Sequence, residues 1–457
     1  MTVKELMALG RLLAGYLELF AECFSSRPIL EHFGAYCRGL LSDLPRKSVE
    51  PIALQCGTPV RTLQRFLRTS IWDHERMRDL YQQRLAASPQ LAKPNELAKP
   101  NESIKSDELA ASSRSAMPDD LGTIGLIDET SVAKKGDETP GVQRQYCGAL
   151  GKQENCIVTV HLGVSRGGFK ALLDSDLFLP ESWSNDRERC RAADIPDDAV
   201  YRSKWKIALE LLDQSRTNGL RFDTLIFDEY YGGKPDFLKG LDERGQQFLA
   251  EVPKSFRVLM KRPRGRRPKK GWTGKRVDNL AKFSAAWHQQ PWQGVPLARL
   301  TLADQVWDVR AAQVHLVRDG DLTERTYWLI VAHNPATGET KYFVSNAPSN
   351  TPLERLLRIA FTRWNIEHLF RVGKSELGFS HFEGRSYVSL IRHMTMCAIL
   401  TGFLAEQTDR LREKKSRDHT GTNPPRPRPT LPSLAKKPPP NDRPPTNRKH
   451  HRLSPTA

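Results

Sequence analysis

Three residues with helical spacing, Arg363, Glu367 and Lys374, form the group best suited to chemistry. At roughly 100° of rotation per residue, Glu367 lies about 40° around a helix from Arg363, and Lys374 about 20°. A single helical stretch would therefore present all three side chains on one face. A carboxylate between two cations suits a metal-bound phosphate backbone, because the acid binds the metal and the bases bind phosphates. The alternative is a solvated helix face with charge pairs four residues apart.

Two upstream aspartates stand where buried strands are expected to end. Asp128 closes the apolar run GLID, and Asp228 closes LIFD. Ligands meet α/β sheets at strand ends, and Mg²⁺ prefers carboxylate oxygens, water and phosphates. We therefore predict that both aspartates and Glu367 converge on two Mg²⁺ ions, although each aspartate could instead cap a turn or a helix. Glu129 and Glu229 rank second, because successive strand residues point to opposite faces.

The order of the expected elements predicts an α/β fold. Residues 119–253 read as three strands, a helix, a strand, a helix and a strand. This is the order of a ribonuclease H-like catalytic domain, with three antiparallel strands followed by parallel ones. Residues 254–346 contain a basic run, KRPRGRRPKK, and several short strand candidates, which predict a β-rich insertion. Residues 347–412 are predicted to be helical and to complete the catalytic domain.

The N-terminal residues 1–88 are predicted to form an all-α domain. Within them, SVEPIALQCGTPVRTLQRFL reads as helix, Gly-containing turn and helix, with Arg61 and Arg65 on the outer face. This pattern is similar to a DNA-binding helix-turn-helix, although many helical hairpins share it. Residues 89–118 hold the tandem hexapeptide LAKPNE and are predicted to be a linker.

The charge of the chain indicates a polyanionic partner. Formal net charge is +17, and the segment from Leu411 onward carries twelve Lys or Arg against three acids, with eleven of the 31 prolines. Residues 413–457 are therefore predicted to be a disordered basic tail. No stretch approaches the ~18 uncharged apolar residues of a membrane-spanning helix. Seven scattered cysteines without a CxxC motif fit reduced cytosolic thiols better than disulfides or zinc.

Three sequence blocks resemble the DDE transposases of bacterial insertion sequences. They are IGLIDETSVAKKGDETPGVQRQYCGALGKQENC around the first aspartate, LIFDEYYGGKPDFLKGL around the second, and RWNIEHLFRVGKSELGFSHFEGRS around the glutamate. The second block contains the Asp-x-x-Tyr-Gly of that family. The related signature has Tyr three residues before the arginine, whereas this chain has Ala360 there. One DNA contact of the family is therefore in question here.

The resemblance implies Mg²⁺-dependent cleavage and transfer of DNA strands at element ends, with Mn²⁺ able to replace Mg²⁺. It makes Asp128, Asp228 and Glu367 the metal-binding triad, and Arg363 and Lys374 contacts to DNA phosphates. Two further cations, Lys134 and Lys135, flank the first acid and would either neutralise phosphates or solvate a loop.

The expected partners are terminal inverted repeats and target DNA, bound by a homo-oligomer in the bacterial cytoplasm, associated with the nucleoid and with no membrane. Two alternatives stay open: a DNA-binding regulator that does not cut, and a ribonuclease H-like nuclease without strand transfer.

Overall fold

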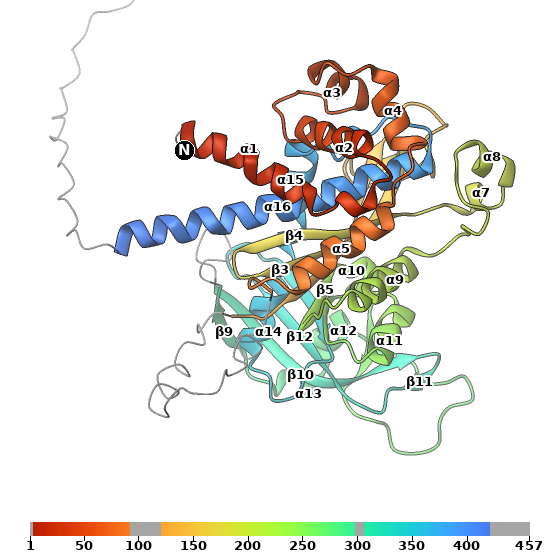
Figure 1. Ribbon diagram of the computed structural model, residues 1–457. Helices are drawn as coiled ribbons and strands as arrows, with labels where there is room; N and C mark the ends of the chain where they lie inside the picture. The colour runs from red at the N-terminus through yellow and green to blue at the C-terminus, as the bar shows by residue number, and fades with distance from the viewer. Residues whose placement is uncertain (1–2, 92–119, 298–305, 421–457) are drawn as a thin grey trace, which may run out of the picture. The chain divides into compact units, whose positions relative to one another are not determined.

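The chain passes from a group of helices into a large sheet, as the sequence predicts (Figure 1). The computed structural model describes residues 3–91, 120–297 and 306–420. Most of the predicted linker 89–118 lies outside the described residues, as does the predicted tail 413–457 beyond Thr420. The helices that precede the sheet are α1 (Val3–Glu18), η1 (Ala21–Cys23), α2 (Arg27–Leu40), α3 (Val49–Gln55), α4 (Val60–Arg68) and α5 (His74–Ala86).

Helices α3 and α4 form the predicted helix–turn–helix. Gly57 adopts a φ of 63°, which an L side chain rarely tolerates, and the Thr58 N–H donates to the Ala53 carbonyl at 2.9 Å. This bond closes the end of α3 and sets the direction of α4. Arg61 and Arg65 stay exposed, while the apolar face of α4 is buried through Leu63, Phe66 and Leu67.

The N-terminal helices are packed onto α16 (Tyr387–Thr420), the long helix at the other end of the described chain (Figure 1). The Tyr16 hydroxyl donates to the Ile399 carbonyl at 3.0 Å. Arg392, buried in α16, donates to the Leu67 carbonyl at 3.0 Å and the Trp72 carbonyl at 2.7 Å. A buried cation thus satisfies carbonyl groups at and after the end of α4, where a helix leaves such groups unpaired.

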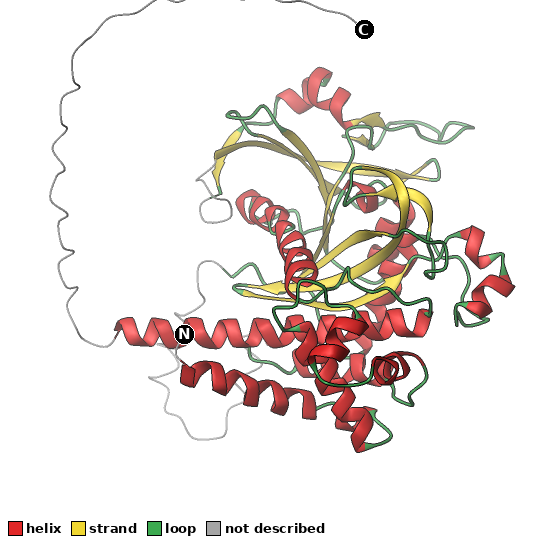
Figure 2. Ribbon diagram, turned by 90° about the horizontal axis from the view of Figure 1, so that it is seen from above, coloured by secondary structure: helices red, strands yellow, loops and turns green. Residues whose placement is uncertain are grey.

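The strands of the described residues form one 13-stranded sheet, which is strongly curved (Figure 2). They are β1 (Ile124–Ala133), β2 (Gln143–Cys147), β3 (Lys152–Arg166), β4 (Phe169–Leu177), β5 (Thr224–Phe227), β6 (Phe248–Glu251), β7 (Arg257–Leu259), β8 (Lys275–Arg276), β9 (Gln293–Pro296), β10 (Val306–Arg318), β11 (Asp321–Leu322), β12 (Tyr327–His333) and β13 (Thr340–Ser345).

The pairing around β1 places an antiparallel and a parallel half side by side. Strand β3 pairs antiparallel with β1 on one side and with β4 on the other. Strand β5 pairs parallel with β1, and β6 parallel with β5. The short strand β2 also pairs with β3, so the first part contains four strands before its first long helix rather than the predicted three.

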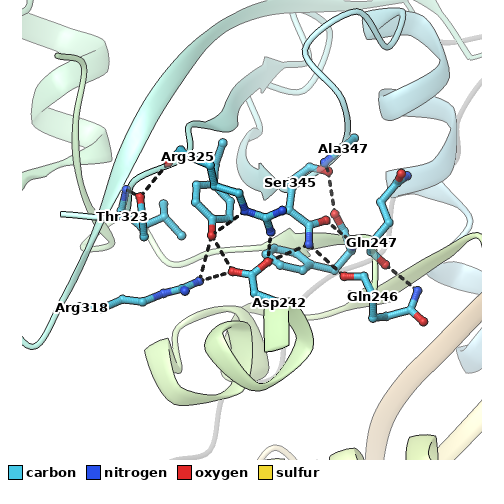
Figure 3. Close-up of polar contacts among 12 residues, drawn as sticks. Asp242, Gln246, Gln247, Arg318, Thr323, Arg325, Ser345 and Ala347 are labelled. Carbon is cyan, nitrogen blue, oxygen red and sulfur yellow. Dashed lines mark hydrogen bonds and ion pairs between the residues drawn. The ribbon is translucent and has the colours of Figure 1, made fainter. Parts of the chain in front are cut away.

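The predicted insertion, residues 254–346, continues the same sheet. Strand β13 pairs antiparallel with β6, and β12 and β10 follow in order. Asp242, at the end of α11 (Pro235–Glu243), ties this part to that helix. Its Oδ2 accepts from Arg318 at 2.6 Å and from the Tyr327 hydroxyl at 2.5 Å, and its Oδ1 accepts from Asn346 at 2.9 Å (Figure 3). The strands of the insertion are therefore fixed to α11, a helix that follows Asp228 in the chain.

The remaining helices lie between and after these strands. They are α7 (Glu181–Ser184), α8 (Arg187–Ala192), α9 (Lys204–Thr217), α10 (Glu229–Gly232), α11 (Pro235–Glu243), α12 (Val277–Phe283), α13 (Ala285–His288), α14 (Leu353–Phe361), α15 (Trp364–Glu376) and α16. Within the described residues, only α16 is long and apolar enough to cross a membrane, over Tyr387–Arg412, and 72% of its most apolar window is buried in the protein. Such burial is that of a core helix.

The expectation of one unbroken helix around Arg363 is wrong. Helix α14 ends at Phe361 and α15 begins at Trp364. The Thr362 hydroxyl donates to the Ile359 carbonyl at 2.7 Å, and the Thr362 and Arg363 N–H groups bond three residues back instead of four. A threonine that bonds its own backbone in this way competes with the helical ladder. Arg363 becomes the residue that leads into α15, still with helical φ and ψ.

Candidate active site

Strand pairing aligns the two predicted aspartates. The parallel pairing of β1 and β5 ends at Leu126 with Ile226, and Asp128 and Asp228 each follow two residues later. Asp228 is the first residue after β5, as predicted. The expectation that Asp128 ends its strand is wrong, because β1 stays paired with β3 through Asp128 to Ala133. Pairing with β5 therefore stops before Asp128, while pairing with β3 continues past it. This opens the sheet beside the two carboxylates.

The pleat of β1 separates Asp128 from Glu129, as predicted. Asp128 lies opposite His161 in the register and contacts Arg363, which leads into α15: its Oδ2 is 3.6 Å from the Arg363 guanidinium. Glu129 points to the other face and pairs with Lys204 of α9 at 2.5 Å. The two acids thus lie on opposite faces of the sheet.

Asp228 caps a short helix while it faces the site. Its Oδ1 accepts from the backbone N–H groups of Tyr230 at 3.0 Å and Tyr231 at 3.3 Å, at the start of α10. The helix-capping alternative considered for this residue is therefore present in the structure. Capping uses one carboxylate oxygen and leaves the other available, so the two roles are compatible.

Glu367 lies on α15 and joins the same group through Arg363. The Arg363 guanidinium is 3.2 Å from Glu367 Oε1, the contact expected for residues four apart on a helix. Glu367 is the most exposed of the three acids, at 41% of its side chain, against 15% for Asp128. The structure thus brings Asp128 and Glu367 to one arginine, from a strand and a helix far apart in sequence.

Glu251, at the end of β6, was not identified from the sequence. Strand β6 pairs with β5 so that Ala250 lies beside Phe227, which puts Glu251 in line with Asp228. Its carboxylate is 3.6 Å from the Arg363 guanidinium and 2.7 Å from Lys341. The strand FLAE ends in an acid just as GLID and LIFD do, so the strand-end argument applied to Asp228 would have made Glu251 a candidate.

The helix that carries Glu367 is positioned by its close packing on β3. A Cβ added to Gly163 would lie 3.2 Å from Ile366 Cδ1 and 3.2 Å from Leu369 Cδ1, so α15 rests on bare strand backbone. Beside it, the buried His161 ring packs edge-on against Phe370, with centroids 4.9 Å apart. Burial and the charge of Lys374 lower the pKa of His161 to about 3, so this ring is neutral and serves packing.

The predicted basic residues are found in different surroundings. Lys374 lies half-buried on α15. Burial lowers the pKa of its amine, and the smaller opposing effects of Cys147 and Asp128 leave that pKa below its ordinary value. Lys134 donates its amine to the Phe382 carbonyl, which gives it a partner inside the protein, whereas Lys135 is exposed. Contacts of these three lysines with DNA phosphates stay predictions.

The aligned aspartates are harder to ionise than ordinary carboxyl groups. Burial, followed by the charge of Asp228, raises the pKa of Asp128 to about 7. Burial also raises the pKa of Asp228, while the α10 backbone and Arg363 lower it. Two buried carboxylates that resist ionisation are groups that a bound cation would stabilise in their charged form.

The donor set suits a hard divalent cation, since carboxylate oxygens from Asp128, Asp228 and Glu367 are the ligands that Mg²⁺ prefers. In the arrangement described for residues 3–91, 120–297 and 306–420, no three His, Cys, Asp or Glu side chains already lie at metal-binding spacing. The Arg363 guanidinium contacts both Asp128 and Glu367. The chemistry of the residues therefore fits the predicted cation, and Arg363 occupies the space between two of them.

The raised pKa of Asp128 predicts a pH-dependent stability. An acid whose pKa is higher folded than unfolded contributes stability when protonated, and loses it as pH rises through the folded pKa of about 7. In EDTA, we expect the wild type to lose a few kcal/mol relative to Asp128→Asn between about pH 5 and about pH 8. Unfolding in urea at each pH measures the difference. A gap between the two proteins that stays constant with pH would contradict the assignment.

Comparison with known proteins identifies the family of the chain. A family model described as DDE superfamily endonuclease matches residues 19–98 and 106–315, which include Asp128 and Asp228 and end before Glu367. The chain is also 27% identical over 381 residues to a probable transposase for insertion sequence element IS701 from Microchaete diplosiphon, covering 81% of each chain. The predicted resemblance to DDE transposases of insertion sequences is thereby confirmed. Because the family model matches more than half of its residues, the chain belongs to the DDE superfamily of endonucleases.

Proposed function

We propose that the protein is a transposase that cuts DNA at the ends of an insertion sequence and joins the freed 3′ ends to target DNA. The observation that carries the proposal is the alignment of Asp128 and Asp228 beside α15, which brings Glu367 to the same arginine as Asp128. The likeness to a probable insertion-sequence transposase supports the same reaction class.

The fold proposed for the catalytic part is ribonuclease H-like. The strand order β4-β3-β1-β5-β6, antiparallel and then parallel, supports this assignment, with β7 to β13 as the insertion between Asp228 and Glu367. An insertion that pairs directly with β6 through β13 extends the sheet next to Glu251. It therefore provides one wall of the site.

In this proposal Asp128, Asp228 and Glu367 hold two Mg²⁺ ions. Such ions, when bound, activate the attacking water or 3′-hydroxyl and stabilise the leaving oxygen. Arg363 and Lys374, on the same side of α15 as Glu367, contact the phosphates that flank the cut and orient the strand. Asp228 keeps one oxygen on the α10 backbone, so its free oxygen approaches the site in a fixed direction.

Recognition of the element ends is proposed for α4. Arg61 and Arg65 are exposed on its outer face, and the apolar face is buried, which leaves the basic side for the DNA. Lys135 is exposed beyond the end of β1, the strand that carries the first acid, and suits a phosphate. We further propose that the protein acts as a homo-oligomer on DNA in the bacterial cytoplasm.

The test is incubation of the full chain with Mg²⁺, a linear DNA that carries the terminal inverted repeats of its element, and a supercoiled target plasmid. We expect nicks at the repeat ends and joined donor–target products on a denaturing gel. Nicks without joined products would favour a nuclease, and binding without nicks would favour a regulator. A DNA of equal length with scrambled repeats is the control and is expected to stay intact.

A further inference from the structure

Arg363 is held by carboxylates from three separate elements. Its guanidinium lies 3.6 Å from Asp128 of β1, 3.6 Å from Glu251 of β6 and 3.2 Å from Glu367 of α15. Only 20% of its side chain is exposed. Glu251 is itself fixed by Lys341 at 2.7 Å, so this third contact comes from an anchored group.

The oxygens that Arg363 contacts are the ones a divalent cation needs. Asp128 Oδ2 and Glu367 Oε1 both face the guanidinium, and a cation bound between these two side chains would take the same space and the same lone pairs. Two cations of like charge cannot share that position at contact distance without strong repulsion. In the protein without DNA, the arginine and the cation therefore exclude each other.

We propose that Arg363 acts as a stand-in cation that closes the carboxylate site to divalent ions while no DNA is bound, and that Glu251 holds it there. The inference rests on the proposed function and adds to it a step that regulates metal binding. An arginine binds phosphate through two parallel hydrogen bonds, so the phosphate of a bound strand competes with the acids for this guanidinium. Its departure would leave Asp128 and Glu367 free for the ion, and loading of the site would follow the arrival of the substrate.

The positions of Glu251 and Lys341 explain why the arginine stays. Asp128 and Glu367 both give up Arg363 if an ion binds them, whereas Glu251 accepts from Lys341 and keeps a carboxylate oxygen toward the guanidinium. Glu251 is thus a positioning residue, which acts through Arg363. If it were instead a fourth ligand, its loss would weaken metal binding rather than strengthen it.

The test measures Mn²⁺ binding to the DNA-free full chain, through the fall of the free Mn²⁺ signal in electron paramagnetic resonance. We expect Arg363→Gln to bind Mn²⁺ about tenfold more tightly than the wild type, because a competing charge is removed. Arg76→Gln is the matched control: it removes the same charge from an exposed ion pair with Glu22 on the N-terminal helices, and is expected to leave the affinity unchanged. Arg363→Lys, which keeps a charge on a shorter and narrower group, is expected to fall between them.

Glu251→Gln decides the second half of the proposal. It is expected to raise Mn²⁺ affinity about threefold, and to change nothing further in the Arg363→Gln background, since pairs that act through one another are not additive. Lower affinity in either background would make Glu251 a ligand and overturn its role. Unchanged affinity in both Arg363 variants, with folding verified by thermal unfolding, would overturn the stand-in role. Neither result depends on DNA cleavage, so the proposed function is tested separately.

Discussion

Asparagine in place of Asp128 is expected to lower cleavage of element ends by at least about a thousandfold, while the affinity for the same DNA changes little. The substitution keeps the shape of the side chain and removes the charge that faces α15 from the centre of the sheet. Several kcal/mol of transition-state stabilisation depend on an anionic ligand there. Single-turnover cleavage with Mg²⁺ and gel-shift titration on one labelled end fragment measure the two effects.

The control for this substitution is Asp213→Asn. Asp213 is also an ion-paired aspartate, 2.6 Å from Arg244, but this pair joins α9 to the end of α11. Its replacement is expected to leave cleavage within about twofold, since a half-exposed ion pair contributes little. Cleavage by Asp128→Asn within tenfold of the wild type would remove Asp128 from the triad.

Alanine in place of Gly232 is expected to destabilise the protein by about 3 kcal/mol and to abolish cleavage by the fraction that still folds. A Cβ at this position would lie 1.9 Å from the carbonyl oxygen of Glu251 and 3.3 Å from Ala250 Cβ. A backbone oxygen cannot rotate away as a side chain can, so α10 must lift from β6. Asp228 caps α10 and Glu251 is the residue struck, so both acids would move together.

Urea unfolding and end cleavage, measured on the same preparation, check both parts of this expectation. Gly15→Ala is the matched control, because a Cβ at that exposed position of α1 meets nothing within 4 Å. Alanine is the better helix former, so this variant is expected to be neutral or slightly more stable. Stability and cleavage of Gly232→Ala at the wild-type level would mean that α10 does not rest on β6 as described.

The candidate triad was accessible to sequence reasoning because strand periodicity is a local property. The pleat alone separates Asp128 from Glu129, and in the structure these residues contact Arg363 and Lys204 respectively. The helix–turn–helix was equally visible, because Gly57 marks its turn and the apolar residues of α4 repeat at helical spacing. Both inferences use residues a few positions apart.

The features that escaped prediction depend on pairing between distant segments. The strand end marks Glu251 only as a candidate, because its contact with Arg363 depends on the pairing of β6 with β5, which local spacing does not reveal. The break before α15 depends on whether the Thr362 hydroxyl bonds its own backbone or a solvent molecule, and packing decides between the two. Pairing of β13 with β6 likewise makes the insertion part of the central sheet, where composition indicated only that it is rich in strands.

The contact between α4 and α16 has a consequence for how insertion sequences of this kind diversify. Arg392 satisfies the carbonyls of Leu67 and Trp72 from within the helix that also packs against α1. Exchanging the first ninety or so residues for a segment whose backbone turns differently after α4 would leave the buried guanidinium without acceptors, at a cost of several kcal/mol. New end specificity in this lineage is therefore expected to arise by substitution on the outer surface of α4, and not by shuffling of whole recognition modules.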